Sequence, residues 1–387
     1  MIPSGIKSVL MVSQTFHPVI GGSERQAFEI SKALAGRGVD VTVLTRRPPG
    51  QPAEETVAGV RIKRFACPGS GLPNSIFFMT RVFFWMLAHA AEYQAVHVHL
   101  ASSPGVAAAL AARLTGRRAV IKLGGGKGVD EISLSRKTFA GRLKLAFYRY
   151  ARPELLVMNG EVLEWLKSTK EYSGFNLRLF RNGVDTGRYT PPLYNEKINA
   201  KTALGLDNSP VFLFVGRLSP EKRIKEFVEA WAELLGEETA PPKVRLVIVG
   251  GGPDAAALKK AVTDLGVAGS VTLAGPQEDL RPYYRAADVF ILPSISEGLS
   301  NSMLEAMACG VAVLASRVGG ARDAVLPGVS GFLFDPLNRG ELKDCLRRHI
   351  ADRSLAVKMG EQARRTAVEK YSMARVADDL LAIYGEG

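Results

Sequence analysis

Short runs of Val, Ile and Leu alternate along the chain with longer segments that have a helical period. An apolar run of four to six residues without polar alternation is typical of a strand buried on both faces, as in a parallel sheet covered by helices. The runs fall into two successive series, which predicts two sheets. The predicted strands are Ser8–Val12, Val39–Leu44, Val60–Arg64, Ala95–His99, Ala119–Leu123 and Leu155–Met158 in the first series, and Val211–Val215, Arg245–Val249, Ser270–Leu273, Val289–Leu292, Val311–Ala315 and Phe332–Phe334 in the second.

This pattern predicts an α/β protein with two Rossmann-like domains, each a doubly wound parallel sheet. A length of 387 residues suits two domains better than one. We place them at residues 1–188 and 196–371, with a linker at 188–195, because Pro191 and Pro192 favour extended backbone there. Ligands of such sheets bind beyond the carboxyl ends of the strands. The two domains are therefore expected to face each other across a cleft that holds the site.

Charge is distributed unevenly between the two predicted domains. The chain carries a formal net charge of +12, and residues up to Thr190 contain 26 Lys and Arg against 13 Asp and Glu. Such a field attracts anionic lipid headgroups, phosphorylated acceptors or nucleic acid, and charge alone does not choose among them. No helix-turn-helix, zinc or single-strand-binding pattern accompanies it, so a basic nucleic-acid-binding protein is a minor alternative.

The cysteines and the longest apolar stretch indicate in which cellular compartment the protein is expected. Cys67, Cys309 and Cys345 form no CxxC or Cys/His spacing, which predicts a reducing environment and no metal site. The N-terminal lead has too short an apolar run for a signal peptide. The stretch Ile76–Ala91 is interrupted by Arg81 and is shorter than a bilayer requires. We predict a cytoplasmic protein without a transmembrane segment.

The segment Ser294–Gly310 follows a predicted strand and carries Glu297 and Glu305 with seven residues between them. If a helix starts near Ser300, its first turn offers unpaired backbone N–H groups to an anion. The two carboxylates can then accept hydrogen bonds from hydroxyls of a donor sugar and a ribose. The alternative is that both glutamates are solvated residues on a helix surface.

A second candidate site lies at the end of the strand Val211–Val215. Gly216 permits a sharp turn, and Arg217 and Lys222 supply two cations that can neutralise a leaving diphosphate. The alternative is a basic turn before a solvated helix. In the first domain, Gly21 and Gly22 can let the backbone approach a phosphate in the same way.

Two histidines end the strand Ala95–His99. Strand alternation places His97 and His99 on the same side, where one could contact an acceptor or the pair could bind a metal. The alternative is two half-buried strand-end histidines, since no further ligand is close in sequence. His17, beside the glycine pair, is a modest further candidate.

The segment Ser135–Arg152 contains six Lys or Arg residues and no acidic residue. Read as one helix, it has an apolar face, which is the profile of a helix lying on an anionic membrane. The alternative is a helix packed in the core with a solvated basic back. The apolar face would carry Phe139, Leu143, Phe147 and Tyr150, flanked by Arg136, Arg142 and Arg149 and opposite Lys137, Lys144 and Arg152.

Six motifs follow one another along the chain: FHPVIGGSE, NGVD, VGRLSPEK, GGGP, YRAADVFILPS and EGLSNSMLEAMACG. In this order and spacing they resemble the retaining family 4 glycosyltransferases of the GT-B fold. The resemblance covers nearly the whole chain and is specific as to family, although the family uses many donors and acceptors. It also implies a last helix, about residues 372–387, that packs back on the N-terminal domain.

By this resemblance, Arg217 and Lys222 bind the donor diphosphate, Glu297 contacts the donor sugar and Glu305 binds the nucleotide ribose. No metal or other cofactor is implied. Many members have a histidine after the strand Ala119–Leu123, whereas this chain reads IKLGGGKG and has an aspartate, Asp323, where glutamate is common. The implied donor-binding residues are Gly21, Gly22, Gly216, Gly252, Gly298, Leu299, Ser300, Asn301 and Glu305, and the acceptor-side candidates are His99, Lys122 and Gly124.

The resemblance implies transfer of a sugar from a nucleoside-diphosphate sugar with retention of configuration. We expect a uridine nucleotide first and a guanosine nucleotide second. The expected acceptor is lipid-linked or belongs to a polysaccharide or glycolipid of the cell envelope, with the enzyme peripheral on the inner face of the membrane. A nucleotide-sugar epimerase of the same architecture is the alternative enzyme class.

Overall fold

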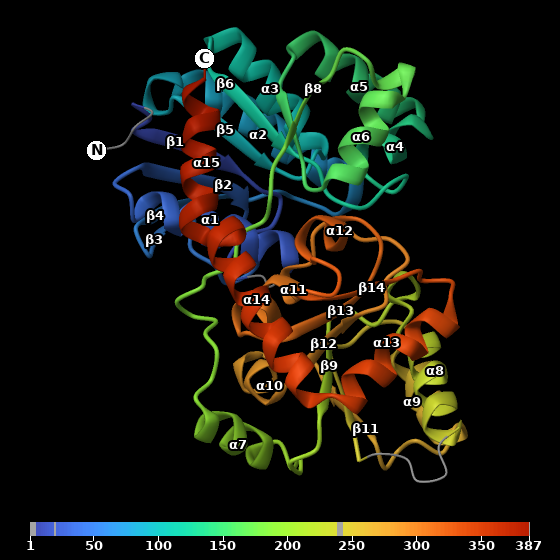
Figure 1. Ribbon diagram of the computed structural model, residues 1–387. Helices are drawn as coiled ribbons and strands as arrows, with labels where there is room; N and C mark the ends of the chain where they lie inside the picture. The colour runs from blue at the N-terminus through green and yellow to red at the C-terminus, as the bar shows by residue number, and fades with distance from the viewer. Residues whose placement is uncertain (1–4, 19–20, 238–242, 387) are drawn as a thin grey trace. The chain divides into compact units, whose positions relative to one another are not determined.

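The structure is a computed structural model that describes residues 5–18, 21–237 and 243–386 (Figure 1). The positions 19 and 20 within the FHPVIGGSE motif and residues 1–4 of the N-terminal lead lie outside this description. The chain folds into two compact units. Unit 1 comprises Met1–Gly183 and Met373–Gly387, and unit 2 comprises Val184–Ser372.

The division at Gly183 precedes the linker expected at residues 188–195. Residues in this stretch are held by unit 2, because Arg364 on α14 (Arg353–Tyr371) donates hydrogen bonds to two carbonyl oxygens. Its Nη1 lies 2.8 Å from the oxygen of Tyr189, and its Nη2 lies 3.0 Å from the oxygen of Thr186. The chain therefore enters unit 2 before the two prolines.

Unit 1 contains an eight-stranded sheet of order β3-β4-β2-β1-β5-β6-β7-β8. From β4 to β8 the strands are parallel and follow a doubly wound order, which reverses between β1 and β5. The strands are β1 (Ser8–Val12), β2 (Asp40–Arg46), β3 (Glu54–Val57), β4 (Val60–Phe65), β5 (Ala95–His99), β6 (Arg118–Lys122), β7 (Glu154–Val157) and β8 (Asn176–Leu179). The helices are α1 (Gly22–Ala35), α2 (Gly71–Ala88), α3 (Ser103–Thr115), α4 (Glu131–Arg136), α5 (Phe139–Ala151), α6 (Gly160–Ser168) and α15 (Met373–Gly385).

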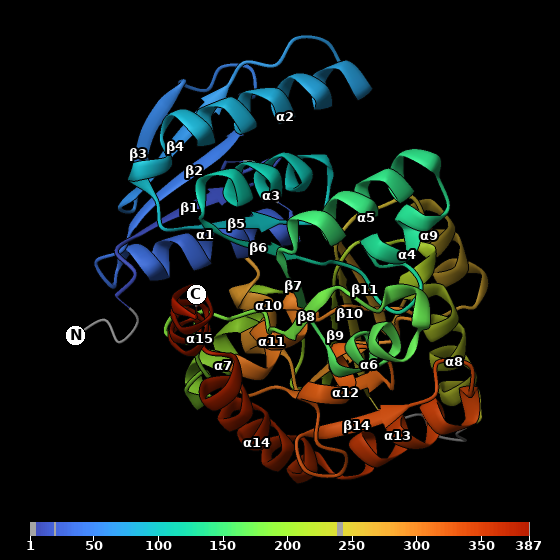
Figure 2. The same cartoon turned by 90° about the horizontal axis from the view of Figure 1, so that it is seen from above.

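Alternate residues of these strands are buried on opposite faces of the sheet, as the period of two requires. Val9 and Met11 of β1 pack with α1 and α15, whereas Leu10 and Val12 pack with α2 and α3. Figure 2 shows α2 and α3 side by side on one face. Both faces are apolar, which explains why the strands read as continuous apolar runs.

The C-terminal helix α15 belongs to the core of unit 1. Its apolar side chains, among them Val376 and Leu380, join the cluster that includes α1. Arg37 donates to Asp378 Oδ1 at 2.9 Å and to the carbonyl of Ala374 at 2.6 Å. Helices α1 and α15, far apart in the sequence, thus share one apolar core.

Unit 2 contains a six-stranded, wholly parallel sheet of order β11-β10-β9-β12-β13-β14, the same doubly wound order. Phe212 and Phe214 of its central strand pack against Trp231 and the neighbouring helices. The strands are β9 (Val211–Val215), β10 (Arg245–Val249), β11 (Val271–Gly275), β12 (Val289–Leu292), β13 (Ala312–Ser316) and β14 (Gly331–Phe334). The other helices are α7 (Tyr194–Ala203), α8 (Ile224–Glu237), α9 (Ala255–Asp264), α10 (Arg281–Ala286), α11 (Asn301–Ala308), α12 (Gly320–Ala324) and α13 (Arg339–Ala351).

Two features of unit 1 differ from expectation. The sheet is not wholly parallel, because the short edge strand β3 pairs antiparallel with β4 and was not predicted, nor was β8. The expected single helix Ser135–Arg152 is two helices, α4 and α5. Thr138 lies between them and is the N-cap of α5, since its hydroxyl accepts a hydrogen bond from the backbone N–H of Gly141 at 3.1 Å.

Candidate functional site

The candidate site of unit 2 lies at the carboxyl ends of β9 and β12. These strands pair directly, and the strand order reverses between them, which is the position where doubly wound sheets bind ligands. Two loops leave the sheet here, one after Val215 and one after Leu292. The backbone N–H of Ile295 donates to the carbonyl of Glu221 at 2.9 Å, so the loops are joined.

Lys222 and Glu297 form an ion pair across these two loops. Ser294 holds the same carboxylate, because its hydroxyl lies 3.2 Å from Glu297 Oε2. Both side chains are largely buried, with 18% of Lys222 and 15% of Glu297 exposed. A pair with so little exposure is positioned better than a flexible surface pair. Its lysine can contact a bound anion in place of Glu297.

Arg217, the other predicted diphosphate-binding cation, is exposed. Within the described part of the chain it makes no hydrogen bond or ion pair. The pKa of Glu221 is lowered mainly by the hydrogen bond from Ser219, and the charges of Lys222 and Arg217 lower it further. Gly216, just before it, hydrogen-bonds through its N–H to the carbonyl of Val249 at 3.0 Å. The expected pair of cations therefore consists of one held side chain and one available side chain.

Glycines let the loops approach one another more closely than other residues allow. Gly319 has φ +50°, and a Cβ there would lie 1.8 Å from the carbonyl oxygen of Glu297. Gly320 donates its N–H to the carbonyl of Gly298 at 2.5 Å. A Cβ at Gly252, another predicted donor-binding position, would lie 2.2 Å from the carbonyl oxygen of Leu218.

The helix α11 begins where the sequence predicts it. Ser300 is the N-cap, and its hydroxyl accepts a hydrogen bond from the N–H of Met303 at 3.3 Å. The predicted cradle, Gly298, Leu299, Ser300 and Asn301, forms the loop and the first residue of this helix. Leu299 is buried, so within the cradle it is a packing residue.

Glu305 lies on α11 and is buried, with 5% of the residue exposed. The hydroxyl of Tyr284 on α10 donates a hydrogen bond to Glu305 Oε2 at 2.8 Å. Burial, and then the neighbouring Glu305 carboxylate, raise the pKa of Tyr284 well above its usual value, so it remains a donor. The alternative of two solvated surface glutamates is wrong for both Glu297 and Glu305. Tyr284 was not predicted.

The acceptor-side candidates lie at the carboxyl ends of β5 and β6 in unit 1. His97 and His99 stack with ring centroids 4.4 Å apart, which confirms that they share a side. Both are fully buried rather than half-buried, and burial lowers the pKa of His97 to about 3 and that of His99 well below its usual value. His97 Nδ1 lies 2.6 Å from the hydroxyl of Tyr384. Neither ring is open to an acceptor in this structure.

Lys122 and Gly124 already have partners. The Lys122 ammonium is buried and donates to Asn182 Oδ1 at 2.5 Å, and burial lowers its pKa to about 8. The N–H of Gly124 donates to Glu131 Oε2 at 2.6 Å. Glu131 was missed from the sequence, because only the fold brings the first turn of α4 to the loop after β6.

The sequence also singles out residues at the start of unit 1 and on α12 of unit 2. Gly21 and Gly22 begin α1 in unit 1, and His17 stacks on the ring of Phe28 with centroids 4.9 Å apart. Asp323 lies on α12 in unit 2. Among the residues that the structure describes, no three His, Cys, Asp or Glu side chains gather as a metal site would require. None of the described helices is both long enough and apolar enough to span a bilayer.

Comparison with known proteins assigns the family. The model of glycosyl transferases group 1 matches residues 196–366, and that of glycosyltransferase family 4 matches residues 20–188. A D-inositol 3-phosphate glycosyltransferase of Stackebrandtia nassauensis is 30% identical over 418 residues, covering 99% of this chain and 92% of the relative. The chain belongs to the family 4 glycosyltransferases. The enzyme class is therefore that of a glycosyltransferase, not the epimerase given as the alternative.

Two further comparisons concern ligands of similar proteins. A GDP-mannose-dependent phosphatidylinositol monomannoside mannosyltransferase of Mycolicibacterium smegmatis is 35% identical over 198 residues, which is 49% of this chain and 51% of the relative. The solved structure of Anabaena Alr3699/HepE in complex with UDP and glucose has a TM-score of 0.78 at 20% identity, over 99% of this chain and 100% of that one. The latter likeness confirms the GT-B fold.

Proposed function

We propose that this glycosyltransferase takes a sugar from a nucleoside-diphosphate sugar bound by unit 2 and transfers it, with retention, to an acceptor bound by unit 1. The observation that supports this most is the ion pair between Lys222 and Glu297 at the reversal of strand order. It holds a cation and a carboxylate at the position where doubly wound sheets bind ligands.

The donor is held by groups of unlike charge. The diphosphate lies against Arg217 and Lys222 and the start of α11, where unpaired N–H groups favour an anion. Glu305, fixed by Tyr284, accepts hydrogen bonds from the ribose hydroxyls. Glu297 binds the sugar hydroxyls once Lys222 turns to the diphosphate. A uridine nucleotide is proposed first and a guanosine nucleotide second.

The reaction breaks the bond between the anomeric carbon and the diphosphate oxygen and forms one to the acceptor oxygen on the same face. The departing phosphate takes the acceptor proton, and Arg217 and Lys222 neutralise the charge that develops on it. Two cations supply this stabilisation without a metal. Glu297 orients the sugar in this scheme and is not a nucleophile.

We further propose a lipid-linked acceptor at a membrane surface, on the cytoplasmic face. The apolar face predicted on α5 is exposed, since 84% of Phe139 and 63% of Tyr150 are accessible. The helix is also packed in the core, as the alternative expects, but through Leu145 and Tyr148 and not through the predicted apolar face. An exposed apolar face on a basic domain suits an anionic membrane.

A thermal-shift panel of UDP, GDP, ADP, dTDP and CDP tests the donor. A ligand at a hundred times its Kd stabilises a protein by about 2.7 kcal/mol. One diphosphate should stabilise the wild type, lose its effect in Glu305→Ala and retain it in Glu361→Ala, an exposed glutamate of α14. If no diphosphate acts, the transferase site is misassigned. NMR of the product with that donor then reads the anomeric configuration.

A further inference from the structure

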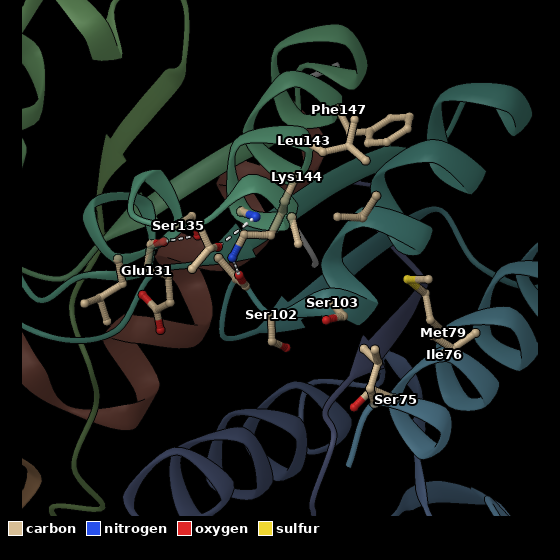
Figure 3. A pocket seen from close by; sticks show the side chains of 17 residues that line it. Ser75, Ile76, Met79, Ser102, Ser103, Glu131, Ser135, Leu143, Lys144 and Phe147 are labelled. Atoms are coloured by element: carbon tan, nitrogen blue, oxygen red, sulfur yellow. Dashed lines mark hydrogen bonds between the residues drawn. The ribbon is translucent and has the colours of Figure 1, made fainter.

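Unit 1 contains a cavity of about 580 Å³ between α2, α3, α4 and α5 (Figure 3). Its wall is mostly carbon, from side chains that include Met79, Val106 and Leu143. This volume lies in the range of sites that bind small molecules. None of the proposed donor-binding residues lines the cavity. Donor binding therefore does not account for it.

The rim of the cavity exposes large apolar side chains. Of the residues that line it, Leu72 is 72% exposed, Leu143 52% and Ile76 50%. They come from α2 and α5, helices far apart in the sequence. Exposed apolar surface around a pocket is typical of a ligand-binding or interaction site.

The cavity has a polar side and an apolar side. In Figure 3 the hydroxyls of Ser75, Ser102 and Ser103 lie along one side, and Leu143 and Phe147 lie on the other. Ser102 and Ser103 follow β5, so the polar side is at the carboxyl edge of the sheet. A ligand that fits this wall has a polar head at the sheet and an apolar body toward α5.

Two cations accompany the polar side. Arg46, at the end of β2, donates to the hydroxyl of Ser75 at 3.1 Å, and its Nε is buried without a hydrogen-bond partner among the described residues. Lys144 lines the cavity and donates to the carbonyl of Ala101 at 2.9 Å. Glu131 also lies on the wall, where it accepts the N–H of Gly124 and offsets part of the charge of Lys144, so that Arg46 is the cation with the fewer acidic neighbours. This arrangement complements an anionic head.

We infer that this cavity binds one hydrocarbon chain of the acceptor, an amphiphile whose phosphate-bearing head lies beside Ser75 and Ser102. The inference rests on the proposed role of unit 1 in acceptor binding. The chain fills the carbon-lined space and enters across Leu72, Ile76 and Leu143. Burial of the chain gives affinity, and the cations place the head at the carboxyl edge of the sheet.

Isothermal titration calorimetry with alkyl phosphates below their micelle concentrations tests this inference. The probes are decyl phosphate, hexyl phosphate and inorganic phosphate. Each buried methylene strengthens binding about fourfold, so decyl phosphate, which is four methylenes longer, should bind about 250-fold more tightly than hexyl phosphate. Equal affinities for the two alkyl phosphates would overturn the inference.

A variant pair separates the part of the apolar face of α5 that lines the cavity from the part that does not. Leu143→Gln combined with Phe147→Gln makes the cavity wall polar at positions that are not core residues, and should abolish the dependence on chain length. Phe139→Gln changes the most exposed apolar side chain of α5, which does not line the cavity, and should leave it intact. An equal loss in both variants would show surface adsorption and overturn the inference.

The outcome is independent of the donor panel. If the nucleoside diphosphates fail to bind while decyl phosphate binds with the expected chain dependence, the proposed transferase chemistry fails and the hydrocarbon site stands. If a nucleoside diphosphate binds and alkyl phosphates show no chain dependence, the transferase stands and the hydrocarbon site does not.

Discussion

The two units share a strand order but differ at the edge where each order reverses. In unit 2 this edge carries an available cation, Arg217, and a largely buried ion pair between Lys222 and Glu297. In unit 1 it carries the stacked, uncharged His97 and His99, surrounded by the core. The same backbone topology thus presents charge in one unit and conceals ionisable groups in the other.

The contrast shows that the topology of the sheet determines where a site lies, whereas the loop residues determine its chemistry. Unit 2 gathers groups that suit a diphosphate. Unit 1 has a carbon-lined cavity beside its edge, with hydroxyls and cations on one side only. A charged donor and an amphiphilic acceptor are the ligands that we propose for these two edges.

The largest expected effect comes from removing the cation that unit 2 holds in place. Lys222→Met should lower kcat/KM by about 10²- to 10³-fold, because the charge on the departing diphosphate loses a preorganised partner. Steady-state kinetics measures this. Lys225→Met, an exposed lysine on α8, removes the same charge nearby and should change kcat/KM little. Similar losses in both variants would attribute the effect to net charge.

The second effect tests the close approach of loops in unit 2. Gly319→Ala places a Cβ against the Glu297 carbonyl at positive φ, so strain and overpacking should together cost about 3 kcal/mol of unfolding free energy. Gly328→Ala is matched, since Gly328 also has positive φ but has open space around it, and should cost about 1 kcal/mol. Urea unfolding measures both. Equal costs would mean that the loops are not in contact there.

The third effect concerns the nucleotide. Glu305→Gln keeps the shape of the side chain but removes its charge, and should weaken binding of the nucleoside diphosphate by about 10- to 100-fold through the loss of a charged hydrogen bond. Tyr284→Phe should weaken binding less, because it loosens the carboxylate without removing it. Titration calorimetry checks the order, and a stronger effect of Tyr284→Phe would contradict the assignment of Glu305 as the ribose ligand.

The sequence predicts most of the sheet positions because the central strands are apolar on both faces, as β1 and β9 show. It does not reveal β3, a short edge strand whose alternate residues are exposed, nor the break at Thr138, which carries no glycine or proline. The positions of Glu297 and Glu305 follow from their motif. The partners Tyr284 and Glu131 do not, because tertiary packing alone brings them to Glu305 and Gly124.

The last effect is expected at the concealed edge of unit 1. Burial lowers the pKa of Lys122 to about 8 from the usual 10.5, so between these values the unfolded chain holds more protons than the folded one. Stability must therefore rise with pH across this window, by at most about 1.4 kcal/mol per unit, and the cost of burying the charge is fully present below pH 8. Lys122→Met removes the group. The free energy of unfolding of the wild type minus that of the variant should increase from pH 8 to pH 10, measured by urea unfolding at each pH, and other titrating groups cancel in this difference. A constant difference would show that Lys122 is hydrated in solution, and the contrast between a charged edge in unit 2 and a concealed edge in unit 1 would then be lost.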